Sequence, residues 1–169
     1  MNELLSGSLG SEMGIINKLE SIQLAQEKED VVKYFTPLYS DETVLFEMPP
    51  QTADEGLFCH RFQTDQLLVV RGSMVLVSLQ NRQYDYILLT QHPMLLIKIP
   101  PGIPHAVINY SCEPCLVLNA IIRHGSPHPK DYQPIKKPFP FDFERVNELL
   151  SKSILEIGDR SQNLGVRKE

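Results

Sequence analysis

The chain of 169 residues has no long basic cluster and no long apolar run. Its formal charge is −5, and no basic cluster is longer than the pair Lys136–Lys137, so the sequence offers no positive surface for nucleic acid or an anionic membrane. No stretch reaches the roughly eighteen apolar residues of a membrane span, and the N-terminus lacks the basic and apolar blocks of a signal peptide. We therefore expect a cytoplasmic protein that binds neither nucleic acid nor membrane.

Cysteine is also scarce. The chain has three cysteines, an odd number that does not make a disulfide framework in a chain of this length, so we expect free thiols. Cys112 and Cys115 have the spacing of a redox or zinc pair, but no second pair or nearby histidine completes a zinc set. Pro114 between them favours a tight turn that leads into a strand.

What the chain has in quantity is short β-rich segments. Its 42% apolar composition is enough for one sizeable core, and we expect one domain. The segments are separated by turn signals, among them Arg71–Gly72 and Asn81–Arg82, at intervals of about 8 to 12 residues, which indicates an antiparallel sandwich or barrel of the all-β class. The predicted strands are 43–48, 57–62, 66–71, 73–79, 83–89, 94–99, 105–110 and 115–122.

Residues 1–42 are expected to form an N-terminal extension to a barrel of residues 43–123. The apolar positions Ile15, Ile16, Leu19 and Ile22 predict a short helix from Gly14 onward. For Val31 to Phe35, helix and strand remain open alternatives.

The C-terminal part is expected to be a loop, a helix and a tail. Residues 124–141 are rich in proline and predict an extended loop, so His124 and His128 do not share the helix that a metal pair at this spacing needs. A helix is predicted over 142–158, and a polar tail over 159–169. Asp142 is the expected N-cap of this helix, and Gly158 is expected to end it. The helix has one apolar stripe, which consists of Val146, Leu149, Leu150, Ile154 and Ile157.

The strongest functional signal is the turn before His105. Three prolines and a glycine precede this histidine, and alternating apolar residues follow it, which is typical of a turn that leads into a strand. With a period of two, Val107 and Asn109 face the same side as His105. The prolines restrict the backbone just before the histidine, which suits a metal ligand or an acid/base.

These residues make up a recognisable pattern. The sequence Pro100-x-Gly102-x-x-His105-x-x-x-Asn109 resembles the second signature motif of the cupins, with Met94 where the family has its first glycine. The first cupin motif is partly present upstream. Its outline is followed by Gly56, His60, Phe62, Asp65, Gln66 and Gly72.

The resemblance covers residues 43–123 and implies a double-sheet antiparallel jelly roll, in agreement with the strand spacing. In cupins a His-x-His pair, a glutamate and the second-motif histidine bind a divalent metal. Here His60 matches the first histidine, Phe62 replaces the second, and Asp65 stands near the glutamate. A reduced set of His60, Asp65 and His105 is therefore the candidate metal site, and we expect either no cofactor or a weakly held divalent metal.

The pair His60-x-x-Gln63 together with Pro100-x-Gly102-x-x-His105 resembles the metal-free nucleotide-sugar 3,5-epimerases among the cupins. That resemblance implies catalytic histidines at positions 60 and 105, and Asp131–Tyr132 is a candidate for the family's remaining acid and base. The ligand-binding candidates are Phe62, Gln63, Gln66 and Asn109.

Three functions stay open on the sequence. The first is a small-molecule-binding cupin that acts as a metal-independent sugar epimerase or isomerase, and the second is a metal-dependent cupin oxygenase or isomerase. The third is a non-catalytic cupin that binds a small polar molecule such as a sugar or carboxylic acid. Family habit and exposed sheet edges also lead us to expect a homodimer.

Overall fold

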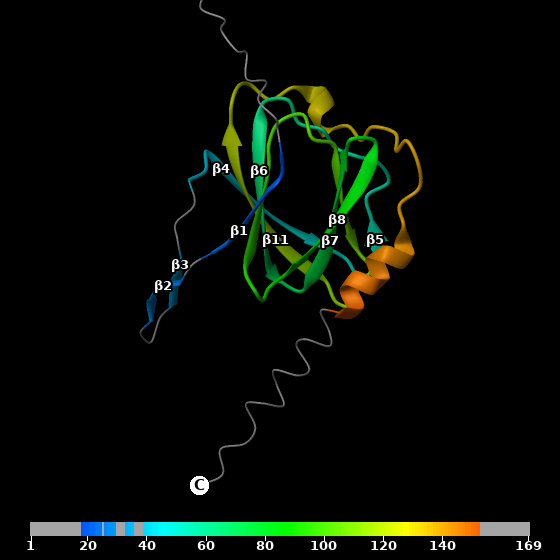
Figure 1. The fold of residues 1–169 in the computed structure, drawn as a ribbon. Coiled ribbons are helices and arrows are strands. Elements are labelled where there is room, and N and C mark those ends of the chain that lie inside the picture. The colour runs from blue at the N-terminus through cyan, green and yellow to red at the C-terminus, as the bar shows by residue number, and fades with distance from the viewer. Residues whose placement is uncertain (1–17, 25, 30–32, 36–38, 153–169) are drawn as a thin grey trace, which may run out of the picture.

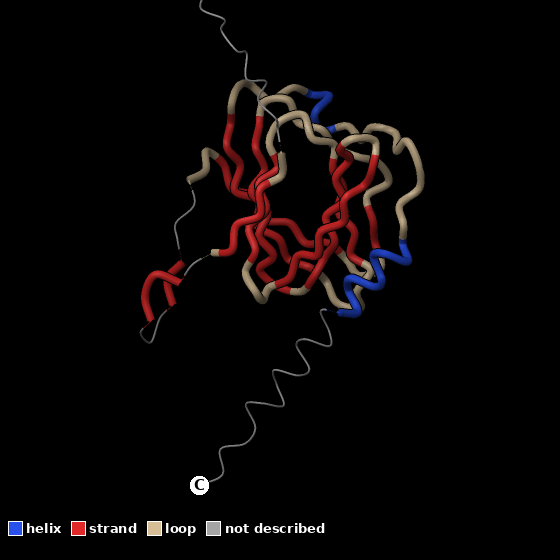
Figure 2. Tube along the Cα trace, in the orientation of Figure 1, coloured by secondary structure: helices blue, strands red, loops and turns tan. Residues whose placement is uncertain are grey.

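The computed structural model describes residues 18–24, 26–29, 33–35 and 39–152, and most of these form a barrel of two facing antiparallel sheets (Figures 1 and 2). The predicted all-β antiparallel architecture is confirmed. The five-stranded sheet has the order β1 (Glu20–Gln23), β9 (Leu95–Ile99), β6 (Gln63–Arg71), β11 (Cys115–Arg123) and β4 (Glu42–Met48). The four-stranded sheet has the order β5 (Thr52–Ala53), β10 (His105–Asn109), β7 (Ser73–Gln80) and β8 (Gln83–Thr90).

Two smaller elements lie outside these sheets. Among the described residues, the strands β2 (Gln26–Glu29) and β3 (Lys33–Phe35) pair only with each other, and they stand apart from the barrel in Figure 1. A 3₁₀ turn, η1 (Pro129–Tyr132), interrupts the long segment that follows β11. Among the described residues, no helix is long and apolar enough to cross a membrane.

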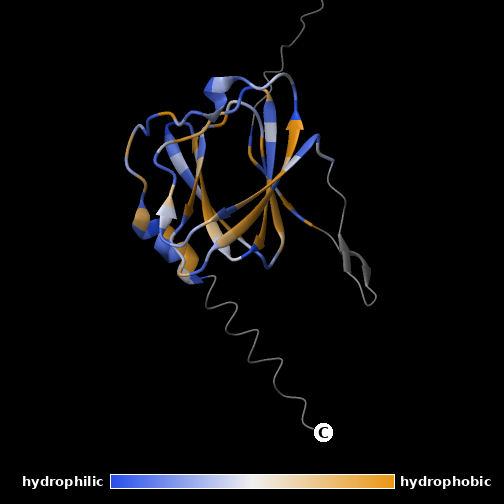
Figure 3. Cartoon of the chain, turned by 180° about the vertical axis from the view of Figure 1, so that it is seen from behind, coloured by the Kyte–Doolittle hydropathy of each residue, from blue (hydrophilic) through white to orange (hydrophobic). Residues whose placement is uncertain are grey.

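The interior of the barrel is filled by the side chains that alternate inward from both sheets. In Figure 3 the strands carry most of the hydrophobic colour, and the loops at one end of the barrel are mostly hydrophilic. The buried core consists of Met48, Leu67, Val69, Met74, Leu76, Leu89, Ile97, Ile99, Ile103, Cys115 and Val117. Burial raises the pKa of the Cys115 thiol to about 11, so this cysteine is a packing residue.

The two predicted hairpin turns are confirmed, and each uses a positive φ. Asn81 and Arg82 have φ values of 50° and 62° in the link between β7 and β8, as expected for a tight turn that follows the twist of its strands. Gly72 has a φ of 85°, and a Cβ atom there would lie 2.7 Å from the carbonyl oxygen of Pro114. Only glycine fits this turn without strain.

The C-terminal helix covers the outer face of the four-stranded sheet. It occupies residues 143–152 of the described chain, and the Asp142 carboxylate accepts a hydrogen bond from the Arg145 amide at 2.9 Å, which confirms the predicted N-cap. The rest of the predicted helix, to residue 158, lies outside the described residues. The second core consists of Leu57, Val75, Val77, Ala106, Ile108, Phe141, Val146 and Leu150.

Two predicted elements are wrong. Residues 57–62 do not form a strand: Leu57 and Phe58 make isolated bridges, and β6 begins only at Gln63. The helix expected to include Ile22 is replaced by β1, which pairs with β9 and thus brings part of the expected N-terminal extension into the barrel; residues 1–17 lie outside the described chain. Pairing with β9 overrides the helical spacing of the apolar positions in this segment.

Candidate functional site

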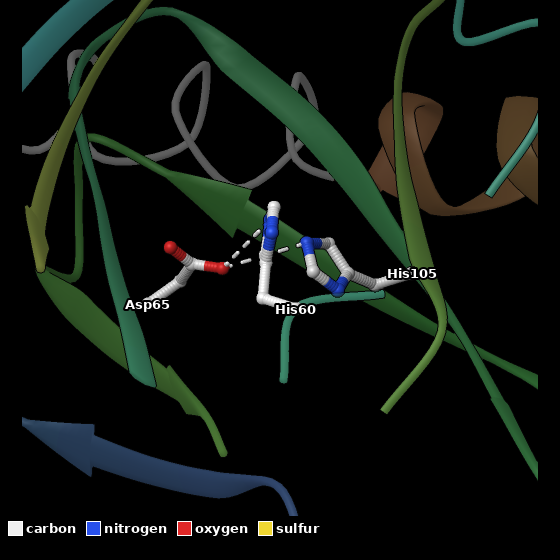
Figure 4. A group of neighbouring side chains, drawn as sticks. All are labelled: His60, Asp65 and His105. Carbon is white, nitrogen blue, oxygen red and sulfur yellow. Dashed lines mark ion pairs between the residues drawn. The ribbon is translucent and has the colours of Figure 1, made fainter. Parts of the chain in front are cut away.

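His60, Asp65 and His105 meet at one end of the barrel (Figure 4). The Nε2 atom of His60 lies 3.4 Å from Oδ2 of Asp65, and the Nε2 atom of His105 lies 3.7 Å from the same oxygen. The centres of the two imidazole rings are 5.4 Å apart. Asp65 comes from β6 and His105 from β10, so the site joins the two sheets.

The loop that carries His60 is tied to the proline-rich turn. Phe58 and His105 exchange two backbone hydrogen bonds of 2.7 and 2.8 Å, and the amide of Gly102 donates to the carbonyl of His60 at 2.8 Å. Gly102 has a φ of 85°, a conformation that glycine adopts without strain. The Pro-x-Gly-x-x-His segment therefore positions both histidines, since it bonds to the His60 loop and begins β10.

The Asp65 carboxylate is held by two neighbouring amides. Its Oδ1 atom accepts hydrogen bonds from Gln63 Nε2 at 2.7 Å and from Asn119 Nδ2 at 2.8 Å. Both donors lie on the inward face, because Gln63 and Asp65 are two residues apart on β6 and Asn119 lies on the neighbouring β11. The Oδ2 atom is thereby directed at the two histidines.

The proton of His105 is placed by its backbone contact. The Nδ1 atom lies 3.0 Å from the carbonyl oxygen of Ile103, which can only accept a hydrogen bond, so Nδ1 carries the proton in the neutral ring and Nε2 keeps its lone pair. Burial lowers the pKa of His105 from 6.5, while the negative charge of Asp65 opposes this shift. Burial therefore favours the neutral form of the His105 ring.

His60 has an unsatisfied buried nitrogen. Its Nδ1 atom has no hydrogen-bond partner among the described residues and is screened from solvent. The side chains of His60 and His105 are 12% and 11% exposed, so both rings are almost enclosed and a small part of each reaches solvent. Two Nε2 atoms and one carboxylate oxygen thus converge at separations longer than a hydrogen bond.

Tyr132 and Arg123 extend the site toward solvent. The ring centre of Tyr132 lies 5.7 Å from that of His60, and its hydroxyl donates to Gln63 Oε1 at 3.3 Å and accepts from Arg123 Nη1 at 3.0 Å. Arg123 also donates to Gln63 and forms an ion pair with Glu42, whose hydrogen bond raises the pKa of the arginine. Of the candidate pair Asp131–Tyr132, the tyrosine lies at the site.

Asp131 fixes the turn that presents Tyr132. It is buried, and its carboxylate accepts a hydrogen bond from the Arg61 amide at 3.2 Å and lies 3.4 Å from Arg61 Nε. Because Arg61 follows His60 directly, this contact connects η1 to the His60 loop. Sequence reasoning missed Arg123, which no motif marks. Its inward direction follows only from the register of Arg123 opposite Gln63.

Three predicted ligand-binding residues do not lie with the histidines. Phe62 is 44% exposed; residues 59–62 are not a strand, so alternation does not place it beside His60. Gln66 faces the outer side of its sheet, where Nε2 donates to the carbonyls of Tyr39 and Ala120. Asn109 lies four residues beyond His105 along β10, about 13 Å away. Of the four candidates, only Gln63 contacts the site.

The three converging ligand atoms fit a divalent cation. The ligand atoms of His60, Asp65 and His105 all lie within 4.8 Å of one another, and two imidazoles with one carboxylate are a set that holds iron or a similar metal with open positions. Hydrogen bonds also orient two of these ligands, since the Ile103 carbonyl orients His105 while the amides of Gln63 and Asn119 orient Asp65. His60 lacks such a bond, because its Nδ1 atom has no partner among the described residues.

A groove of about 500 Å³ lies at the edge strand β8, to one side of the histidine site. Asp85 lines it, and Asp85 pairs with Ser78, which in turn pairs with His105. Two strand spacings, about 10 Å, therefore separate the groove from His105. Its other lining residues are Lys18, Leu19, Gln80, Tyr84, Tyr86, Ile87 and Arg145.

Solved structures similar to this chain include two sugar isomerases and a sugar epimerase. A sugar 3,4-ketoisomerase from Thermoanaerobacterium thermosaccharolyticum, in complex with TDP, has a TM-score of 0.56 and 11% identity over 82% of this chain and 98% of its own. A dTDP sugar isomerase from Desulfovibrio desulfuricans has a TM-score of 0.54 and 20% identity over 72% and 89%. A 4-keto-6-deoxy sugar epimerase from Streptomyces spheroides has a TM-score of 0.54 and 13% identity over 73% and 84%.

This is the RmlC-like cupin fold. The predicted jelly roll is therefore confirmed by neighbours as well as by the two antiparallel sheets. No family model and no curated protein matches the chain. Because the identities are at most 20% among these three structures, the likeness establishes the cupin fold, and the chemistry follows from this chain's own residues.

Proposed function

We propose that this protein is a sugar isomerase or epimerase that moves a proton at a carbon next to a ketone of a nucleotide-linked sugar. The observation that carries the proposal is the enclosed group of His60, Asp65 and His105 with Tyr132 beside it. The similarity to a dTDP sugar isomerase and to a sugar 3,4-ketoisomerase in complex with TDP supports this substrate class.

The histidine and carboxylate group provides the base. A neutral imidazole takes a proton from the sugar carbon next to the ketone. The C–H bond of that carbon breaks, and electron density moves onto the ketone oxygen to form an enolate. Asp65 lies 3.4 Å from His60 Nε2 and 3.7 Å from His105 Nε2. Its negative charge therefore stabilises the imidazolium on either ring, and the amides of Gln63 and Asn119 hold the carboxylate in place.

Tyr132 provides the second proton carrier. Its hydroxyl contacts Arg123 and Gln63, and its ring lies 5.7 Å from the His60 ring at the open end of the barrel. Return of a proton to the opposite face of the same carbon inverts that carbon. Return to the neighbouring carbon, after a proton shift between the oxygens, moves the ketone. Both reactions are redox-neutral, so neither requires an electron acceptor.

A second candidate is a metal-dependent isomerase or oxygenase, which the converging ligand atoms favour. His60, Asp65 and His105 would hold the cation. A bound divalent metal supplies Lewis-acid stabilisation of negative charge on a substrate oxygen. In that function Tyr132 and Arg123 still line the open end of the site and orient the substrate.

The test combines proton exchange with metal analysis on the full chain. The wild-type protein is incubated in D₂O with TDP-linked 4-keto sugars, and deuterium uptake at the carbons next to the ketone is followed by NMR. We expect uptake with wild type and its loss with His60→Ala, while His92→Ala, which removes an exposed histidine outside the site, keeps it.

The same preparations distinguish the alternatives. Metal content is measured after purification without chelator, and ligand binding is followed by thermal shift with nucleotide sugars, free sugars and small carboxylic acids. Stoichiometric metal that disappears with His60→Ala, together with exchange that requires it, favours the metal-dependent function. A thermal shift without any deuterium uptake contradicts catalysis and leaves a binding cupin.

A further inference from the structure

The Asp65 carboxylate is held by two side-chain amides, and the orientation of each amide is itself fixed from its far end. Oδ1 of Asp65 accepts hydrogen bonds from Gln63 Nε2 at 2.7 Å and from Asn119 Nδ2 at 2.8 Å. Oδ2 is left to face the two imidazole rings (Figure 4). A side-chain amide has a donor end and an acceptor end, and only the donor end can bond a carboxylate. The group that binds the oxygen end of each amide therefore contributes to how Asp65 is held.

The two amides are bound at their oxygen ends by different kinds of donor. For Asn119 the donor is the backbone amide of Gln66, which bonds Oδ1 at 3.0 Å. For Gln63 the donor is a side chain, because Nη1 of Arg123 bonds Oε1. A guanidinium has no acceptor, so this contact fixes the oxygen of Gln63 toward Arg123 and leaves the nitrogen to face Asp65. The Gln63 amide thus depends on a single side chain, whereas the Asn119 amide depends on the backbone.

Strand pairing brings Arg123 to Gln63. Arg123 ends β11, Gln63 begins β6, and the two residues are cross-strand partners, so their side chains leave the sheet on the same face. Gln63 is buried, and a buried amide oxygen without a donor is destabilising. Tyr132 also reaches this oxygen, at 3.3 Å, but a hydroxyl can either donate or accept. Arg123 is therefore the contact that allows only one orientation of the amide.

The Arg123 guanidinium is occupied by acceptors of the protein itself. Its Nε atom donates to Glu42 Oε2 at 3.1 Å, and Nη2 bonds the same oxygen. Its Nη1 atom donates to Gln63 and, at 3.0 Å, to the Tyr132 hydroxyl. These four bonds use four of the five N–H groups of a guanidinium. Arg123 therefore acts chiefly within the hydrogen-bond network of the protein.

We propose that Arg123 is a positioning residue that acts on the histidine site through Gln63. Glu42 holds Arg123, and Arg123 holds the oxygen of Gln63. The nitrogen of Gln63 in turn holds Asp65, whose Oδ2 atom lies 3.4 Å from His60 Nε2. Loss of Arg123 frees the oxygen end of the amide, and the carboxylate then keeps only one firmly oriented donor. The expected effect on catalysis rests on the proposed function, whereas the expected effect on the Gln63 amide does not.

The first measurement is made on the Gln63 side-chain amide and requires no substrate. In the unmodified protein, NMR should show that its two Nε2 protons exchange with solvent about 10-fold more slowly, or slower still, than those of the exposed Gln83. Arg123→Met should remove most of this protection and shift the ring-nitrogen resonances of His60. Arg123→Lys keeps a donor and should restore part of the protection. Exchange at the rate of Gln83 in the unmodified protein overturns the proposal even if no variant folds.

The second measurement is deuterium uptake by the TDP-linked 4-keto sugars. Arg123→Met should lower kcat about 10-fold with KM nearly unchanged, the lower end for loss of a hydrogen bond that orients a site residue. Gln63→Met should have a similar effect. Adding Arg123→Met to Gln63→Met should cost about 3-fold or less, because the two residues belong to one network. In the Tyr132→Phe background, Arg123→Met should keep its full effect, which separates the route through Gln63 from a route through the tyrosine.

Arg71→Met is the matched control. Arg71 ends β6, at the opposite end of the strand from Gln63, and forms an ion pair with Glu47 at 3.0 Å, so this variant should equal wild type in both measurements. The proposal is overturned if folded Arg123→Met leaves the Gln63 amide unchanged, or if the effects of Arg123→Met and Gln63→Met multiply in full. Absence of deuterium uptake in wild type contradicts the proposed function, and the amide measurement then decides the role of Arg123.

Discussion

Asp65 Oδ2 lies 3.4 Å from His60 Nε2 although the two residues belong to different kinds of element. Asp65 is in the middle of the sheet on β6, and His60 is in the loop before that strand. The carboxylate is fixed by strand pairing and by two amide donors, whereas the histidine is fixed by backbone bonds to the proline-rich turn. The proposed base is thus assembled from two independently supported parts, each of which can be changed separately.

Replacing His105 with Gln should abolish most of the proposed proton exchange while leaving the barrel folded. Glutamine has a similar volume and retains an amide that reaches toward Ile103, but it cannot accept a proton at neutral pH. Loss of acid/base help should lower the exchange rate by roughly 10²–10⁴. Stopped-flow or NMR exchange rates measure the effect, with near-UV circular dichroism as the check on folding. An unchanged rate would remove His105 from the mechanism.

Replacing Tyr132 with Phe should separate catalysis from binding. The substitution keeps the ring beside His60 but removes the hydroxyl that contacts Arg123 and Gln63. We expect slower exchange by roughly 10²-fold, the lower end for a lost acid or base, with little change in ligand affinity. Tyr39→Phe is the matched control, because Tyr39 is 70% exposed and bonds only Asp41 through its hydroxyl among the described residues. Equal exchange rates in the two variants would contradict a role for Tyr132.

His105 should make the folded state sensitive to acid. Its pKa is lowered on folding from 6.5, chiefly by burial, so below pH 6.5 the unfolded chain binds a proton that the folded protein binds only at lower pH. The free energy of unfolding should therefore decrease as the pH falls from 6.5, by up to about 1.4 kcal/mol per pH unit from this group.

Urea unfolding of wild type and His105→Gln between pH 5 and 7 measures this contribution. Asp65, His60 and Asp54 also act on the charge of His105, and the difference between the two proteins largely subtracts their own titration. The variant should show the smaller loss of stability on acidification. A steeper loss in the variant than in wild type would show that the pKa of His105 is raised on folding.

The parts of the fold that were predictable are those with a local cause. Asn81–Arg82 and Gly72 mark their turns through residue chemistry, and the segment before His105 marks the start of β10. The strand predicted over residues 57–62 follows from the regular series of short β-rich segments, and the structure has a loop there. The path of this loop is decided instead by backbone bonds to a turn more than forty residues later in the chain.

Site residues were predictable from the sequence only where a motif or the alternation of a strand identifies them. His60, Asp65 and His105 were named together on the sequence, and the structure brings them together. The prediction for Gln66 is wrong because Gln63 and Asp65 face the interior of the barrel on β6, so the alternating strand turns Gln66 to the outer face. Arg123 lies at the site because it contacts Gln63, which is 60 residues away in the sequence. Neither composition nor periodicity predicts a contact between residues so far apart in the chain.

Asn109 was expected to bind ligand, and the structure gives it a structural role that can be tested. Its Nδ2 atom donates to the carbonyls of Met48, Pro49 and Glu113 at 2.9 to 3.1 Å, and its Oδ1 atom accepts from the amide and hydroxyl of Ser111. The side chain is fully buried. It therefore ties the end of β4 to the turn between β10 and β11.

Asn109→Ala should lower the free energy of unfolding by about 2–4 kcal/mol, because it removes the five hydrogen bonds that this buried side chain makes. Urea unfolding measures this loss, and Gln83→Ala, which truncates an exposed side chain on β8, should change stability by less than about 0.5 kcal/mol. Ligand shifts and proton exchange should persist in the folded Asn109→Ala protein, because Asn109 lies about 13 Å from His105 along β10. Loss of ligand binding without loss of stability would instead return Asn109 to the binding site.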